Sequence, residues 1–269
     1  MRFLIVAAAA LFVFASGGAA VAQECEAMAG TQISPISFDA AATALSSVPA
    51  KDEFETTAQY QTRVEAALAG ISSRMLVSAP FDTEYATYNA DAGRFEIRSY
   101  AVRNLNTDWF TVFYGSPHYG GIRYSTLGNI DLVLSSSDRP NGTYQGQNSY
   151  GATWTVTRVT RTVNAIFERE PARYNEELFG QRPAGAAPLT WTLPVPVEQA
   201  RGMRDRFRAA VLIAPRAPFF FENRQQSAGR ITIQNPRDVE QVSRIIVADI
   251  QCVVITDDQN NVLIAQRTV

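Results

Sequence analysis

Histidine, lysine and cysteine are scarce in this sequence, and their scarcity excludes several kinds of chemistry. The 269 residues contain one histidine, His118, one lysine, Lys51, and two cysteines, Cys25 and Cys252. One histidine and two cysteines are too few for a four-ligand zinc site. The chain also lacks the G-x-S-x-G segment of many serine hydrolases. We therefore expect no metal and no cofactor.

An excess of positive charge is missing as well. The formal net charge is −2, and the arginines are scattered along the chain. Nucleic-acid binding depends on clustered cations that neutralise phosphates. We therefore expect no nucleic-acid partner.

Long hydrophobic runs are missing except at the amino-terminal end. Arg2 precedes an apolar stretch from Phe3 to Ala15, which is followed by Ser16, two glycines and Ala20-Val21-Ala22. The stretch is shorter than the roughly 20 apolar residues of a spanning helix. Its order predicts a signal peptide over residues 1–22, cleaved near Ala22. We expect a periplasmic or secreted protein with no membrane span in the mature chain.

The two cysteines suit an oxidising compartment. Cys25 lies near the start of the predicted mature chain and Cys252 near its end, so a disulfide between them is the natural expectation. Ile246, Ala248, Ile250, Cys252 and Val254 alternate with other residues, which predicts one continuous apolar face with Cys252 in the core. The alternative is a buried free thiol.

Hydrophobic residues are plentiful, and many short strand patterns accompany a few helical ones. Hydrophobic residues make up 46% of the chain, enough to bury a sizeable core. Helices are predicted over three segments: residues 37–48, the segment that follows a capping box of Thr56 and Gln59, and the segment that begins at Pro196. In the third helix, Ala200, Met203 and Phe207 are expected to face inward. Strand patterns dominate from Tyr85 onward. The fold class is therefore α+β and β-rich, with antiparallel sheets and a few covering helices.

Two predictions concern the middle of the chain. Residues 136–150 read as a polar loop whose turn is marked by Arg139-Pro140-Asn141-Gly142. In the next strand, over 153–168, the apolar residues change from even to odd positions. This change predicts a bulge or sharp bend near Arg158.

The same patterns suggest a division of the mature chain. Residues 23–72 form an amino-terminal tail and helical segment, 73–180 a β-rich lobe, and 181–269 a carboxy-terminal β lobe with one helix. The linker-like segment 180–188 marks the boundary between the lobes. A single continuous domain over both lobes is the alternative.

The segment from Lys51 to Arg63, KDEFETTAQYQTR, carries a resemblance. It resembles a stretch of uncharacterised exported bacterial proteins, where it opens the mature domain. The resemblance covers about thirteen residues and implies export, but it implies no activity.

The candidate site residues lie in a loop rich in glycine and aromatic residues. His118 lies two residues from Ser116, but a hydrolase triad needs a geometry that sequence neighbours do not supply. Tyr119 and Tyr124 are the candidates for an exposed aromatic surface that contacts a sugar or a peptide. We therefore assign His118, Tyr119 and Tyr124 to ligand binding and assign no catalytic residue.

These features favour an exported, non-enzymatic binding or accessory module. Its partner is expected to be an envelope protein, a glycan or a peptide. The alternative function is a cell-wall or small-molecule hydrolase that uses carboxylates, or His118 with Ser116, brought together by folding.

Overall fold

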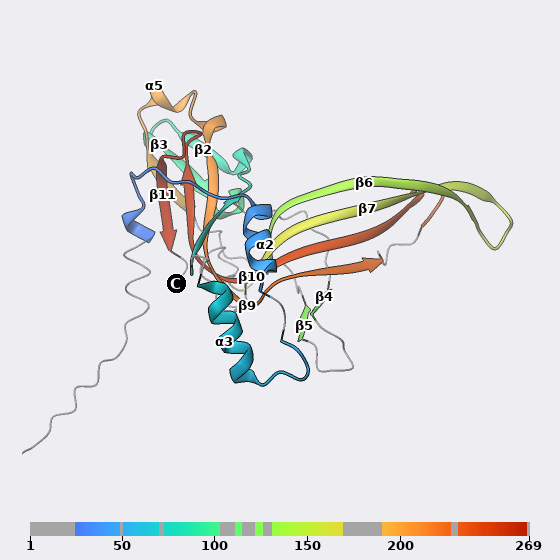
Figure 1. Ribbon diagram of the computed structural model, residues 1–269. Helices are drawn as coiled ribbons and strands as arrows, with labels where there is room; N and C mark the ends of the chain where they lie inside the picture. Colours follow the sequence, from blue (N-terminus) through green and yellow to red (C-terminus); the bar gives the residue numbers. More distant parts are fainter. Residues whose placement is uncertain are drawn as a thin grey trace, which may run out of the picture.

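The structure is a computed structural model that describes residues 25–48, 51–69, 73–102, 111–114, 122–125, 131–168, 190–226 and 231–267. Strands make up most of this part of the chain, and most of the strand pairs are antiparallel (Figure 1). The predicted β-rich α+β fold is therefore confirmed.

The main sheet contains six strands, four of which are unusually long. Five of them follow the order β1-β9-β10-β7-β6, and the sixth strand, β11, also pairs with β10. All neighbours are antiparallel except β7 and β10, which run parallel from Thr157 and Arg237 onward. The strands are β1 (Met75–Ala79), β6 (Asp131–Gln147), β7 (Thr153–Glu168), β9 (Arg208–Gln226), β10 (Arg237–Thr256) and β11 (Val262–Arg267).

Two smaller sheets accompany the main one. A three-stranded sheet has the order β2-β3-β8, and β4 pairs with β5. Their bounds are β2 (Ala86–Asn89), β3 (Arg94–Arg98), β8 (Thr190–Pro194), β4 (Thr111–Tyr114) and β5 (Ile122–Ser125). The main sheet joins β6 and β7, from the first predicted lobe, to β9 and β10, from the second. The linker-like segment 180–188 lies outside the described residues.

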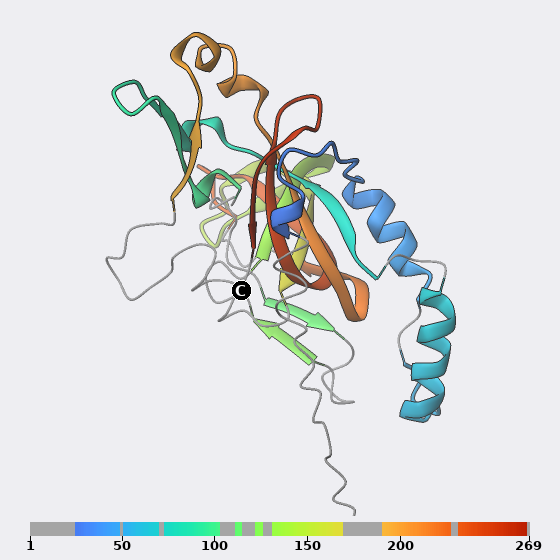
Figure 2. The same cartoon turned by 90° about the vertical axis from the view of Figure 1, so that its left-hand side faces the viewer.

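Two helices pack along one side of the body (Figure 2). Helix α2 (Phe38–Ser46) begins after Ser37, whose side chain accepts a hydrogen bond from the Ala40 backbone nitrogen. Helix α3 (Thr57–Leu68) begins with the predicted capping box, in which Thr56 and Gln59 each bond the other's backbone nitrogen. Both caps satisfy backbone donors that would otherwise lack partners.

The predicted helix after Pro196 is much shorter than expected. Helix α5 covers only Val197–Ala200, and a 3-10 turn over Arg204–Arg206 follows Gly202. Glycine is unfavourable inside a helix, which explains the early end. Ala200 and Phe207 are buried as predicted, but Phe207 reaches the core from extended backbone.

The largest buried cluster joins α2 to the main and three-stranded sheets through residues such as Leu45, Ile97 and Ile246.

The predicted continuous face of β10 is wrong at Cys252. A register shift between Ile250 and Cys252 inserts Gln251, so Cys252 and Val254 lie in a separate cluster with Cys25. The bulge reverses the alternation, and Val253 and Ile255 continue the main core instead.

The predicted loop over 136–150 is also wrong, because strand β6 continues to Gln147. Pro140 pairs with Val159 and Thr143 with Thr157, which leaves Asn141 and Gly142 opposite Arg158. The predicted irregularity near Arg158 is therefore found on β6, while β7 follows β10 without a register shift. Gly142, at φ +87°, tolerates the bulge, and Pro140 is compatible with an edge strand.

Cys25 and Cys252 form the predicted disulfide, and both are fully buried. The bond closes a loop with a sequence separation of 227. We expect the double variant Cys25→Ser, Cys252→Ser to lose up to about 5 kcal/mol of unfolding free energy, since an open chain has more unfolded conformations. Urea denaturation measures this loss. A reductant should destabilise the original protein and leave the double variant unchanged; equal stability of the two proteins would contradict the expectation.

Arg244 connects α2 to three strands of the main sheet. Its Nη1 donates to Oδ1 of Asp39 in α2 at 2.5 Å and to Asn164 in β7 at 3.2 Å. Its Nε lies 3.5 Å from a carboxylate oxygen of Glu222 in β9. The guanidinium carbon also lies 5.3 Å from the Phe38 ring centroid and 5.9 Å from that of Phe220. One planar cation thus joins polar and aromatic partners from separate elements.

We expect Arg244→Lys to lower the unfolding free energy by about 1 kcal/mol, because an ammonium group keeps the charge but loses the planar fork and the stacking. Urea denaturation measures the change. Arg94→Lys is the matched control, since Arg94 forms a single exposed pair with Glu96 and should change little. Equal effects of the two substitutions would show that Arg244 does not join these elements.

Candidate binding site on the strand arm

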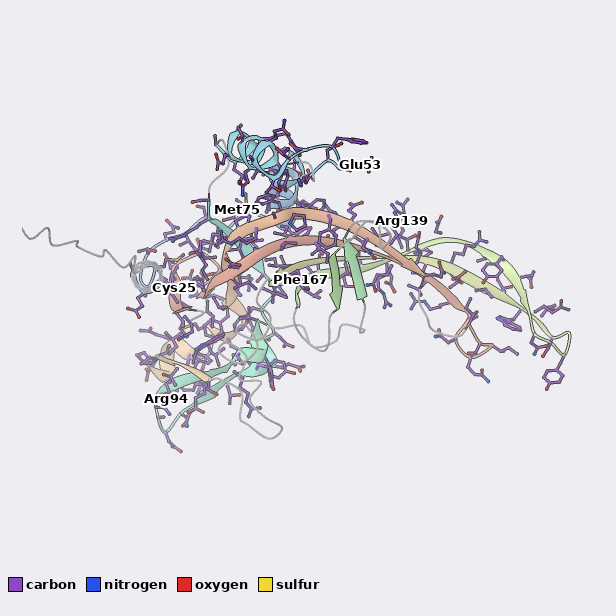
Figure 3. All side chains as sticks on the ribbon, turned by 90° about the horizontal axis from the view of Figure 1, so that it is seen from below. Cys25, Glu53, Met75, Arg94, Arg139 and Phe167 are labelled. Carbon is purple, nitrogen blue, oxygen red and sulfur yellow. A yellow bond between two sulfur atoms is a disulfide. The ribbon has the colours of Figure 1, made fainter. Side chains whose placement is uncertain are left out.

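Four strands leave the body together and form a curved arm (Figure 1). We define the arm as residues 136–162, which comprise the outer parts of β6 and β7 and the turn that joins them, together with 222–226 of β9 and 237–242 of β10. Figure 3 places Phe167 within the body and Arg139 where the arm extends away from it. The hairpin of β6 and β7 reaches farther than the other two strands. Ordinary strands have about five or six residues, whereas β6 has 17 and β7 has 16.

The register assigns the arm residues to two faces. Arg158, Asp238 and Tyr144 belong to one face, which we call the groove face. Asp138, Arg161 and Arg237 belong to the opposite face. Within the body, both faces of the same strands are buried, in clusters that contain Ile166 on one side and Phe167 on the other. The arm is therefore the continuation of a buried sheet into solvent.

Ion pairs hold three arm strands together on the face opposite the groove. Asp138 in β6 accepts a hydrogen bond from Nε of Arg161 in β7 at 2.8 Å. It accepts another from Nη2 of Arg237 in β10 at 2.5 Å. The bonds from Arg161 hold the pKa of the Asp138 carboxyl below its ordinary value against the opposing effect of partial burial, and Arg237 acts in the same direction.

The groove face contains a hollow of about 320 Å³. Its polar lining comes from all four arm strands: Asn141, Arg158, Thr160, Gln226, Asp238 and Glu240. Such a volume is at the lower end of small-ligand sites. The residues come from distant parts of the sequence and meet because β7, β9 and β10 are neighbours.

Hydrogen bonds hold the groove side chains in place. Tyr144 donates its hydroxyl hydrogen to Oδ2 of Asp238 at 3.2 Å, and Gln226 donates to Oδ1 of the same carboxylate. The Arg158 guanidinium carbon lies 4.9 Å from the Tyr144 ring centroid. Desolvation and then the bond to Asp238 raise the pKa of Tyr144, so its hydroxyl stays a donor. Oε1 of Glu240 lies 3.7 Å from Nη1 of Arg224.

Trp154 lies farther along the groove face, against Gly146 of the paired strand. A Cβ added to Gly146 would stand 3.2 Å from Cε2 and 3.4 Å from Nε1 of the indole. The glycine therefore provides the space that the ring occupies. Trp154, Val156 and Arg158 alternate along β7, which places the indole on the same face as the groove.

The outer end of the arm has an unusual composition. Residues 140–157 contain no charged side chain and consist mainly of Thr, Gln, Gly, Asn, Ser, Tyr and Trp. Binding loops of antibodies favour a similar mixture, because rigid aromatic rings give contact area and small polar residues give hydrogen bonds.

The hairpin end presents Tyr150 with 94% of its surface exposed. Oδ1 of Asn148 accepts hydrogen bonds from the backbone nitrogens of Tyr150 and Ala152, each at 3.0 Å. Gly151 adopts φ +84°, and its backbone nitrogen donates to Asn148 at 3.0 Å. The turn therefore has a defined conformation before any partner binds.

The binding residues predicted from sequence are not those of the arm. His118 and Tyr119 lie outside the described residues, and for Tyr124 only its place in β5, opposite Val112, is described. The sequence prediction missed Tyr144, Trp154 and the residues of the groove. The absence of charge between Arg139 and Arg158 is a sequence signal of the arm, but the same composition is also typical of a loop.

Neither a metal-binding cluster nor a membrane-spanning helix is found among the described residues. Within them, no group of three or more His, Cys, Asp or Glu side chains is arranged to hold a metal ion. No helix in the described ranges is both long enough and apolar enough to cross a membrane. The Asp257 carboxylate accepts hydrogen bonds from the backbone nitrogens of Gln259 and Asn261, so it holds the turn between β10 and β11.

Comparisons of the chain with protein-family models, with curated proteins and with solved structures each found no match. The interpretation of the arm therefore depends on its geometry and composition.

The lowered pKa of Asp138 gives a pH dependence with a defined sign. The ionised carboxylate is stabilised in the folded state, so its contribution is present above the ordinary aspartate pKa of about 3.9 and is lost as the pH falls through the lower folded-state pKa. We expect Asp138→Asn to lower the unfolding free energy at neutral pH. The loss should not exceed about 1 kcal/mol, because the ion pairs are partly exposed. Urea denaturation across the acidic range should show the difference shrinking below about pH 4. A difference independent of pH would contradict this.

Proposed function

We propose that this chain is an exported, non-enzymatic binding module of the bacterial envelope and that the arm is its contact element. Export is supported by the signal-peptide pattern and by the Cys25–Cys252 disulfide, which suits an oxidising compartment. The observation that carries the proposal is the projection beyond the body of an uncharged hairpin, which presents an exposed Tyr150 whose backbone nitrogen bonds Asn148.

The edge of β6 supports the same conclusion. Among the described strands, β6 is at the end of the sheet order, and no described strand pairs with its other edge. Natural edge strands are usually protected by charged residues, prolines or bulges, because an open edge pairs readily with other chains. The bulge and Pro140 protect the inner part of β6, but Thr143 to Gln147 contain neither charge nor proline. Covering by a partner explains why this outer segment lacks protection.

The alternative function, a hydrolase, has weaker support in the groove. Asp238 and Glu240 both line it, but they project in the same direction from a single strand. Glycoside hydrolysis instead places two carboxyl groups on either side of the scissile bond. Asp238 is also occupied by Tyr144 and Gln226. The geometry therefore favours fixed hydrogen-bond acceptors over an acid and base pair.

Removing the outer hairpin tests the proposal. Deletion of residues 143–158 leaves Asn141-Gly142 between the paired residues Pro140 and Val159, and Asn-Gly is a favoured two-residue hairpin turn. We expect the shortened protein to keep the circular dichroism and disulfide of the body. Its binding to isolated cell envelopes, measured by co-sedimentation, should fall by at least about tenfold, a loss of about 1.4 kcal/mol in binding free energy.

A substitution in another exposed hairpin provides the matched control. Asp91→Ala lies in the turn between β2 and β3, on the body, and should leave binding unchanged. Full retention of envelope binding by the folded deletion variant would show that the arm is not the contact element.

A further inference from the structure

The groove face of the arm combines an aromatic ring with a row of fixed polar groups. We propose that this face binds a neutral polysaccharide strand, with Trp154 as the stacking platform and the groove as the hydrogen-bonding subsite. This inference rests on the proposed function, because it names the ligand class that the arm contacts.

Trp154 is positioned to stack against a ligand. One side of the indole lies against Gly146, where an added Cβ would stand 3.2 Å from Cε2 of the ring and 2.9 Å from Cγ2 of the fully buried Val156. The ring is therefore supported from the sheet side and only part-buried. An aromatic ring held in this way offers its other side to the C–H face of a sugar ring, which is the apolar surface of a saccharide.

The groove carries hydrogen-bonding groups that suit a saccharide. Sugar hydroxyls both donate and accept hydrogen bonds, so they need neighbours of both kinds. Asp238 and Glu240 are acceptors, the Arg158 guanidinium is a donor, and Thr160 and Asn141 can act in both roles. Each carboxylate has about four lone-pair sites, so Asp238 keeps capacity beyond its bonds to Tyr144 and Gln226.

Tyr144, Asp238 and Arg158 are preorganised by their contacts with one another. Tyr144 is the centre of the network, since its hydroxyl bonds Asp238 while its ring lies beneath Arg158. These contacts join β6, β7 and β10, so the polar groups are held in position before a ligand arrives. Side chains that are already ordered lose less conformational entropy on binding. This saving matters most for a neutral ligand, because such a ligand lacks strong charge attraction.

Charge defines the ligand further. The groove contains the cation Arg158 and the anions Asp238 and Glu240, the latter paired with Arg224. The adjoining residues 140–157 carry no charge. A polyanion would meet the two carboxylates, and a polycation would meet the arginines. A strand of neutral sugars avoids both forms of repulsion.

The test uses the purified protein that starts at Gln23 and two defined probes, the hexasaccharides of glucose and of N-acetylglucosamine, in isothermal titration calorimetry. We expect one of them to bind, and we expect Trp154→Ala to weaken that binding by about tenfold, the equivalent of about 1.4 kcal/mol. Trp154→Phe should recover most of the affinity, since phenylalanine keeps an aromatic face. Asp238→Asn, which keeps the shape of the side chain, should weaken binding without removing the platform.

Thr155→Ala is the matched control, because Thr155 neighbours Trp154 but belongs to the opposite face, where Gln145 bonds it. Circular dichroism and urea denaturation verify that each variant is folded. Equal affinity of Trp154→Ala and Thr155→Ala for the bound hexasaccharide would overturn the inference.

Other outcomes separate this inference from the proposed function. If neither hexasaccharide binds, while deletion of residues 143–158 still abolishes envelope binding, the glycan inference fails and the arm remains the contact element. If envelope binding is lost in Tyr150→Ala but retained in Trp154→Ala, the contact is at the hairpin end, as for a protein partner, and the glycan inference again fails. If the deletion leaves envelope binding intact, both proposals fail.

Discussion

The parallel pairing of β7 with β10 is the contact on which the rest of the structure depends. It joins the β6–β7 hairpin to the β9–β10 pair over the whole stretch from Thr157 to Glu168, without a register shift. Parallel neighbours need a long crossover connection, so the pairing fixes segments that are far apart in sequence. In the body it places Ile166 beside Ile246 on one face and Ala165 beside Ile245 on the other, and each pair belongs to a buried cluster.

The same pairing continues past the edge of the core, and the chemistry of the strands changes there. Arg244 lies at this boundary, bonded to Asp39 of α2 and stacked against Phe38. Beyond it, threonine, glutamine and arginine replace valine and isoleucine, and the Asp138 ion pairs take the place of apolar packing between the strands. A partly solvated sheet cannot be held by apolar burial, so hydrogen bonds and ion pairs maintain its alignment.

The candidate site is a consequence of this continuation. Tyr144 and Asp238 are 94 residues apart in sequence and form a hydrogen bond only because β6, β7 and β10 lie in order. The bulge at Asn141 and Gly142 lets the hairpin continue beyond Arg158 while Tyr144 remains on the groove face. Gly146 then leaves room for the Trp154 indole. A rigid sheet face can hold aromatic and polar groups in fixed positions far from the core.

The sequence by itself determined the β-rich class, the capping box at Thr56 and Gln59, and the pairing of the only two cysteines. The β-rich class follows from the alternation of apolar residues, the capping box from local hydrogen bonds, and the disulfide from the presence of only two thiols. Only the tertiary structure decided the path of residues 136–150 and the face of Cys252. Asn141-Gly142 suits both a turn and a bulge, and the sheet partner selects between them. Likewise, the insertion of Gln251 reverses the alternation of β10, and no local pattern reveals it, because the residues after Gln251 are apolar at both odd and even positions.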